Sequence, residues 1–109
     1  MNVEKLKKSK EYSLVFTGGK RVSSKNFNLQ VLDTETNSLR VGITASKKIG
    51  NATKRNFVKR RMRSLININF PRICLEPKDY VLVAKKGVAL TKFESLSEEL
   101  NLLLKKIEK

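Results

Sequence analysis

At 109 residues the chain is long enough for one domain, residues 1–109, and its single cysteine excludes an internal disulfide and suits a reducing compartment. Its 24 Lys and Arg residues against 10 Asp and Glu give a net charge of +14, which implies a polyanionic partner, by default a nucleic acid. Histidine, the commonest general base and metal ligand, is absent, and the apolar runs are too short to span a bilayer.

The N-terminal segment precedes a short predicted helix. Residues 1–8 are polar and lysine-rich and show no signal-peptide core, so we expect them to be loosely ordered and the protein to be cytoplasmic, without a membrane partner. Ser9 can cap the helix, with Glu11 favourably placed in its first turn. The glycine pair at 18–19 is expected to end it through a left-handed residue. Its apolar positions are Tyr12, Val15 and Phe16. Core packing is the ordinary role of such aromatics, although aromatics beside a basic groove also stack on unpaired bases.

Two segments with apolar side chains at every second position predict β-strands at 27–32 and 39–45. Only a short polar turn separates them, so antiparallel pairing is the simplest arrangement. The faces that alternate with the apolar ones are polar and small. Their residues are Asn28, Gln30, Arg40, Gly42 and Thr44. This polar face is either an open surface or the floor of a groove.

A basic helix is predicted from about Ala52 to Phe70, with Asn51 as its N-cap and Pro71 at its end. One side is predicted to pack on the core: Val58, Met62, Leu65, Ile66 and Asn69. Another side carries a stripe of like charges at i, i+4 and i+8, namely Arg55, Lys59 and Arg63, widened by Asn56 and Arg60. Like charges at this spacing destabilise an isolated helix, so the stripe favours a polyanionic partner over a merely solvated face.

The C-terminal third predicts a strand and a helix. The apolar run at 80–84 is typical of a central strand covered on both faces. Thr91 can cap the last helix and form a capping box with Glu94. That helix has an apolar stripe made of Phe93, Leu96, Leu100, Leu103, Leu104 and Ile107. The element order α-β-β-α-β-α predicts an α+β fold, with helices packed on one small sheet and a helical crossover that allows parallel pairing of 39–45 with 80–84. Cys74 is interpreted as a small buried apolar residue.

We find no pattern for catalysis or metal binding by this chain. The acids are scattered, whereas a two-metal nuclease needs converging carboxylates. The turn at Gly50 lacks the flanking residues of a phosphate-binding loop, and without histidine no Ser–His dyad exists. The sequence therefore predicts a binding protein, with no small-molecule substrate.

The central segment resembles the signature of the protein subunit of bacterial ribonuclease P. The motif is Ser46-Lys47-Lys48-Ile49-Gly50-Asn51-Ala52, followed by Arg55-Asn56, Lys59-Arg60 and Arg63. Further family-like blocks are Tyr12, Val15, Phe16, Gly19 and Phe27, then Leu39-Arg40-Val41-Gly42, then Asp79-Tyr80-Val81. The resemblance implies a two-layer α/β sandwich like the second domain of ribosomal protein S5, with a left-handed β-α-β crossover. It also implies a holoenzyme that removes the 5′ leader of precursor tRNA, with catalysis by a large RNA that binds most of the Mg²⁺.

The resemblance also implies residue roles. The residues expected to contact the catalytic RNA are Lys48, Asn51, Lys54, Arg55, Asn56, Lys59, Arg60 and Arg63. The leader is expected in a cleft between the first helix and the polar sheet face, with Tyr12 and Phe16 as its aromatic residues and Gln30 on the sheet face. The residues expected to flank this cleft are Ser46, Lys47, Lys85 and Lys86. Two positions depart from the family pattern: Phe57 replaces a basic residue and is expected to pack at the border of the apolar face, and Gln30 stands where relatives often carry an aromatic.

Two other functions remain open. A small ribosomal RNA-binding structural protein would be equally basic, and cosedimentation with ribosomal subunits without rescue of precursor-tRNA cleavage would favour it. A duplex-DNA binder is the third hypothesis, although no helix-turn-helix turn precedes the basic helix and no dimerisation segment follows it.

Overall fold

The computed structural model describes residues 3–34, 38–72 and 76–107, and the prediction for Cys74 lies outside these residues. The strands are β1 (Val3–Lys5), β2 (Lys20–Ser23), β3 (Phe27–Leu32), β4 (Leu39–Ala45) and β5 (Asp79–Ala84). The helices are α1 (Ser9–Gly18), α2 (Ala52–Asn69) and α3 (Phe93–Ile107). Short 3₁₀ turns are η1 (Lys47–Ile49), η2 (Phe70–Arg72) and η3 (Lys86–Ala89). None of these helices combines the length and the apolar character that crossing a bilayer requires.

The five described strands form one sheet in the order β1-β4-β5-β3-β2. The central place of β5 and its parallel pairing with β4 confirm the sequence prediction. The predicted direct pairing of β3 with β4 is wrong, because β5 lies between them and pairs antiparallel with β3. The reason is burial: the continuous apolar run of β5 is most stable in the middle of the sheet, where both faces are covered.

Two edge strands were absent from the predicted order. Residues 3–5 pair in parallel with β4 and Leu6 is buried, so the expected loose N-terminus is wrong for these residues. Strand β2 pairs antiparallel with β3, and the described order is β-α-β-β-β-α-β-α. Strands of three or four residues contain too little alternation to predict a strand, and the neighbouring strand supplies their hydrogen bonds.

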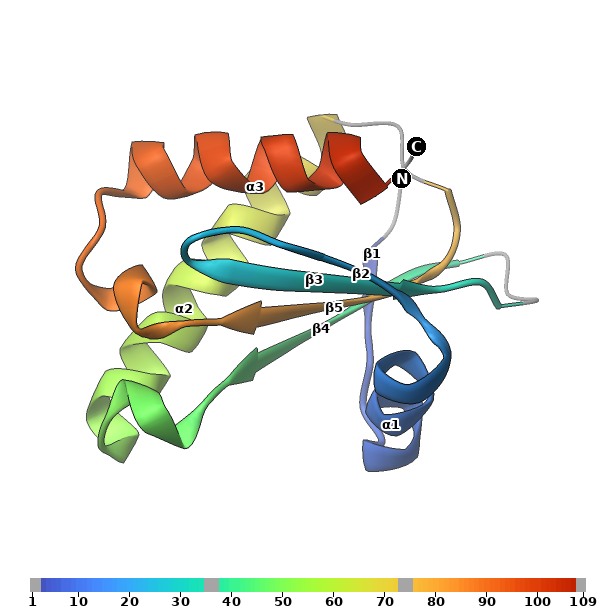
Figure 1. Cartoon of the computed structure of the whole chain (residues 1–109), viewed down its shortest axis with the longest axis horizontal. Coiled ribbons are helices and arrows are strands. Elements are labelled where there is room, and N and C mark those ends of the chain that lie inside the picture. The colour runs from blue at the N-terminus through green and yellow to red at the C-terminus, as the bar shows by residue number, and fades with distance from the viewer. Residues whose placement is uncertain (1–2, 35–37, 73–75, 108–109) are drawn as a thin grey trace.

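Helices α2 and α3 cover one face of the sheet, and α1 covers part of the other (Figure 1). The larger core lies between the sheet and α2 and α3, and it includes the predicted inward residues of β3. All five residues predicted for the buried side of α2 are buried, and five of the six in the α3 stripe are too, with Phe93 partly buried. The α+β class is confirmed. The likeness to ribosomal protein S5 and the hand of the β4-α2-β5 crossover stay predictions.

A smaller core lies beneath α1. It contains Leu6, Val15 and Val81, with Tyr12 packed against it. The sheet face that the sequence left open as surface or groove is therefore partly covered by α1.

The ends of α1 differ from the prediction. Ser9 is the first helical residue and not the cap; the Glu11 carboxylate accepts hydrogen bonds from the backbone N–H groups of Lys7 (3.1 Å) and Lys8 (2.9 Å). Gly19 has φ −89°, so no left-handed residue ends the helix. Glycine is needed there for close approach, because a Cβ would lie 2.5 Å and 2.7 Å from two backbone carbonyl oxygens.

Of the N-caps predicted for the other two helices, one is confirmed and one is wrong. Asn51 caps α2 as predicted, since its side-chain oxygen accepts from the Lys54 N–H at 3.0 Å. Thr91 does not cap α3: its hydroxyl donates to the Gly87 carbonyl at 2.7 Å, and the helix begins at Phe93.

Candidate nucleic-acid interface

Helix α2 presents its predicted RNA-binding residues on the side opposite the core. Arg55 and Lys59 are half-buried and the others are exposed; the full set is Lys48, Asn51, Lys54, Arg55, Asn56, Lys59, Arg60 and Arg63. The helix is oriented by its apolar side, which packs on β4 and α3. The sequence pattern therefore located both sides of α2 correctly.

The cations of this surface lack partners within residues 3–34, 38–72 and 76–107. None of Lys48, Lys54, Arg55, Lys59, Arg60 and Arg63 forms an ion pair or a side-chain hydrogen bond with any residue that the structure describes. Six positive groups without counter-charges repel one another, and their repulsion is relieved when phosphate groups approach. The arrangement is chemically suited to binding a nucleic-acid backbone.

One basic residue of α2 has a different role. Arg61 donates from Nη1 to the Val88 carbonyl at 2.7 Å, and its guanidinium carbon lies 5.5 Å from the centre of the Phe57 ring. This contact ties α2 to η3. Phe57 was expected to pack at the border of the apolar face, but it is 41% exposed and its ring lies against Arg61 instead.

A cavity of about 480 Å³ lies at the end of the sheet nearest η1 and η3. Four lysines line it, and three of them were predicted site residues: Lys48, Lys85 and Lys86, with Lys25 as the fourth. The other lining residues include Asn28, Ser46 and Val83. Ser46, Lys85 and Lys86 were assigned to the leader and Lys48 to the catalytic RNA, so the two predicted sets meet here. Lys25 was missed, because only the pairing of β3 with β5 brings the β2–β3 turn beside Lys85.

The β2–β3 turn is fixed by a carboxylate from α3. Glu99 accepts hydrogen bonds from the Asn26 N–H (2.7 Å), from the Asn26 side-chain amide (2.8 Å) and from the Ser24 hydroxyl. Lys85 donates from its backbone N–H to the Asn26 carbonyl (2.9 Å) and from Nζ to the Ser24 carbonyl (2.6 Å). Lys85 therefore helps to build the cavity wall as well as contributing charge, and Glu99 indirectly holds Lys25 at the rim.

The predicted leader residues on α1 and β3 do not line this cavity. Tyr12 lies over Gly42, where a Cβ would come within 2.5 Å of the Tyr12 ring, and its hydroxyl donates to the Leu6 carbonyl at 3.4 Å. Burial raises the pKa of Tyr12. Phe16 is 43% exposed on α1, whereas Gln30 is only 9% exposed. The structure therefore does not bring the leader residues together around one cavity, since Gln30 is almost fully covered and Tyr12 lines a different cavity. Leader binding at these residues stays a prediction.

Lys47 completes the predicted set. It lies in η1 and is exposed. The Ser46 hydroxyl accepts from the Lys48 N–H at 3.2 Å and so caps this turn, which sets Lys47 and Lys48 beside the N-terminus of α2.

An ion-pair cluster beneath the sheet attaches α1. Arg40 donates from Nε and Nη2 to the two carboxylate oxygens of Asp79, at 2.7 Å and 2.6 Å, and from Nη1 to Glu11 at 2.5 Å. The Asp79 hydrogen bond raises the pKa of Arg40. Hydrogen bonds from the Lys8 and Lys7 backbone, and then the charge of Arg40, lower the pKa of Glu11. Sequence reasoning treated Arg40 as one residue of the polar face and missed this structural role.

Within the described residues, no three Asp, Glu or Cys side chains come together as a group that could hold a metal ion. The assignment of Mg²⁺ mainly to the RNA subunit stays a prediction.

Comparisons with known proteins give one consistent family. The family model described as Ribonuclease P matches residues 1–108. A ribonuclease P protein component of Streptococcus agalactiae is 35% identical over 101 residues, covering 93% of this chain and 91% of the relative. One from an Exiguobacterium species is 38% identical over 91 residues, covering 83% and 78%. The solved RNase P protein from Thermotoga maritima superposes with a TM-score of 0.84 at 29% identity, covering 97% of this chain and 99% of that structure.

Proposed function

This chain belongs to the ribonuclease P protein family, as the protein component of a tRNA-processing ribonucleoprotein, and we propose that α2 is the surface through which it binds the ribonuclease P RNA. The single observation that supports this role is the set of six α2 and η1 cations that have no partner among the residues that the structure describes. Arginine forks and lysine ammonium groups bind phosphate oxygens, and each neutralised phosphate makes the affinity more dependent on salt.

We further propose that the 5′ leader of precursor tRNA runs into the 480 Å³ cavity. Its four lysines supply phosphate contacts, and Asn28 and Val83 supply a polar and an apolar floor. Phe16, exposed on α1, is available to stack on a leader base. Recognition of this kind depends on backbone charge and stacking, and it tolerates different leader sequences.

The catalytic groups in this proposal belong to the RNA subunit. The described residues offer no carboxylate cluster for Mg²⁺, so the ions that assist phosphodiester hydrolysis would be held mainly by the RNA. This chain contributes binding and orientation, and we place the particle in the cytoplasm, where precursor tRNA is made.

Reconstitution tests the proposal. The purified chain is mixed with ribonuclease P RNA and 5′-labelled precursor tRNA at low Mg²⁺, and release of the leader fragment is followed. We expect the wild-type chain to stimulate cleavage at the mature 5′ end. The Arg55→Ala/Arg63→Ala variant should stimulate only at much higher protein concentration, because it lacks two phosphate contacts. Accurate cleavage by the chain without RNA, or no stimulation by the wild-type chain, would contradict the proposal.

A further inference from the structure

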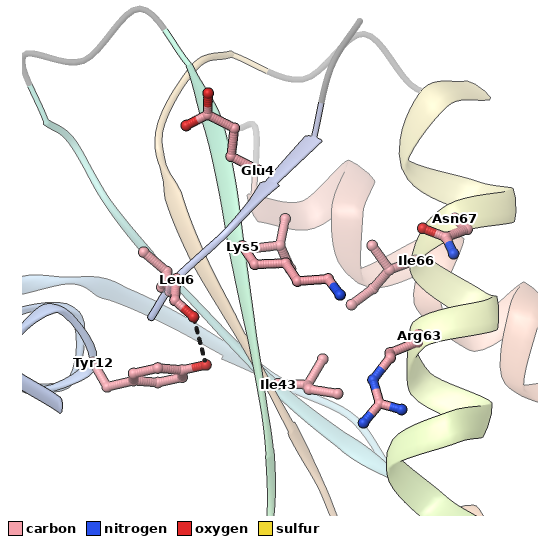
Figure 2. Close-up of a pocket in the computed structure, with 9 residues that line it drawn as sticks. Glu4, Lys5, Leu6, Tyr12, Ile43, Arg63, Ile66 and Asn67 are labelled. Atoms are coloured by element: carbon pink, nitrogen blue, oxygen red, sulfur yellow. Dashed lines mark hydrogen bonds between the residues drawn. The ribbon is translucent and has the colours of Figure 1, made fainter. Parts of the chain in front are cut away.

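A second cavity, of about 150 Å³, lies between the edge strand β1, strand β4 and helix α2. Figure 2 shows Lys5 from β1, and Arg63 and Asn67 from α2, at this cavity. The Tyr12 hydroxyl of α1 also borders the cavity and donates to the Leu6 carbonyl. Ile43 and Ile66 form apolar walls beside them. The volume is well above the ~10–15 Å³ that a single water needs, so a small polyatomic anion fits.

The positive charges at this cavity are not balanced by the part of the chain that the structure describes. Neither the Lys5 ammonium nor the Arg63 guanidinium has an ion pair or a hydrogen bond with a described residue. Glu4 also borders the cavity, but strand alternation turns it away: Glu4 is in register with Arg40, and Lys5 with Val41 on the α2 side. The Glu4 carboxylate points away from the space between Lys5 and Arg63 (Figure 2).

We propose that Lys5 and Arg63 bind one phosphate group together, with the Asn67 amide as a third donor. A guanidinium supplies a planar fork and an ammonium a point charge, a combination that matches a tetrahedral anion approached from two sides. The two cations repel each other in the free protein, and a shared anion converts this repulsion into two attractions.

This site rests on the proposed function, because its phosphate is a phosphodiester of the RNA that lies along α2. Arg63 is the last cation of the α2 stripe, and Lys5 continues that stripe across the edge of the sheet. The short strand β1 then forms part of the RNA-binding surface, and RNA binding holds it against β4. Free inorganic phosphate has the same chemistry and is the alternative source of the anion.

The test compares Lys5→Gln with Lys92→Gln, which removes the same charge from an exposed residue before α3. Affinity for ribonuclease P RNA is measured at several salt concentrations. We expect Lys5→Gln to weaken binding roughly five- to tenfold and to reduce the log–log salt slope by ~0.7–0.9, with Lys5→Arg restoring most of both. Lys92→Gln should leave the affinity within about twofold, as expected for a charge outside the interface.

A double variant identifies the shared phosphate. If Lys5 and Arg63 bind the same group, the loss in Lys5→Gln/Arg63→Gln is smaller than the product of the single losses; independent contacts give the product. Equal effects of Lys5→Gln and Lys92→Gln overturn the site. If the wild-type chain itself fails to bind the RNA, the proposed function fails instead, so the two failures are distinguishable.

A second experiment distinguishes an RNA phosphate from free phosphate. Inorganic phosphate is titrated into the RNA-free chain, and the backbone amides around Lys5 and Arg63 are followed by NMR. Weak, millimolar binding that disappears in Lys5→Gln, together with the loss in RNA affinity, supports the site as an RNA-phosphate site. Phosphate binding with unchanged RNA affinity shows a free-phosphate site and overturns the RNA assignment. Thermal unfolding of each variant verifies that the fold is retained.

Discussion

The outer surface of α2 and the underside of the sheet use arginine in opposite ways. Beneath the sheet, Arg40 directs three hydrogen bonds at the carboxylates of Asp79 and Glu11. On α2, Arg55, Arg60 and Arg63 have no such partner among the described residues. The comparison teaches that charge alone does not identify a binding surface. What distinguishes the two regions is whether the protein supplies the counter-charge itself, because only unpaired cations gain from an external anion.

The largest effect on stability is expected for Arg40, whose counter-charges belong to the protein itself. Arg40→Ala leaves Asp79 unpaired with its side chain only 3% exposed and also releases α1, so it should lower the free energy of unfolding by about 3 kcal/mol. Urea denaturation measures this loss. Arg60→Ala, on the exposed surface of α2, is the matched control and should stay within about 0.5 kcal/mol of the wild type. Equal stability of the two variants would remove the distinction between the regions.

For RNA affinity, we expect the larger effect from the α2 arginines. Arg55→Ala/Arg60→Ala should weaken binding to ribonuclease P RNA by about two orders of magnitude at moderate salt and reduce the salt slope by almost two units, with unfolding nearly unchanged. A filter-binding titration at several salt concentrations measures both quantities. The double variant Lys92→Ala/Lys106→Ala removes the same charge elsewhere, and an equal loss in it would show that only net charge matters.

The comparison also shows which parts of the site the sequence could predict. The two sides of α2 were correct because helical periodicity alone determines which residues face the core. Only some of the residues that line the 480 Å³ cavity were predicted from the sequence. Lys25 was not, because it reaches the cavity through the pairing of β3 with β5, which the residues next to Lys25 in the sequence do not reveal. The wrong prediction that β3 pairs with β4 has the same origin, because β5, which follows much later in the chain, lies between them. Local patterns predict elements, whereas the neighbours of each strand depend on the burial of the whole sheet.

Glu99 combines the features of the two regions. Its carboxylate is bonded within the protein, and through the β2–β3 turn it positions the cation Lys25 at the proposed leader cavity. Glu99→Gln keeps the shape but cannot accept all the hydrogen bonds from Asn26 and Ser24, so stability should fall by about 1–2 kcal/mol. With Lys25 no longer held at the rim, the preference for precursor over mature tRNA should fall about two- to fivefold. Glu98→Gln, the exposed neighbour, is the control.

For Glu99→Gln, the informative quantity is the ratio of the two tRNA affinities. An equal loss of affinity for precursor and mature tRNA would indicate general destabilisation and not a change at the leader cavity.

The smallest expected effect is the pH dependence of the stability that Glu11 contributes beneath the sheet. The pKa of Glu11 is lowered below its ordinary value of 4.5, mainly by the Lys8 and Lys7 backbone hydrogen bonds and then by Arg40. A carboxylate with a lowered pKa stabilises the folded state above its unfolded pKa, and this contribution is lost as the pH falls through the folded pKa. The difference in melting temperature between the wild type and Glu11→Gln should therefore be constant near neutral pH and shrink as the pH falls below about 4.5. A difference that instead grew at low pH would mean that the Glu11 carboxylate does not help to hold α1 to Arg40.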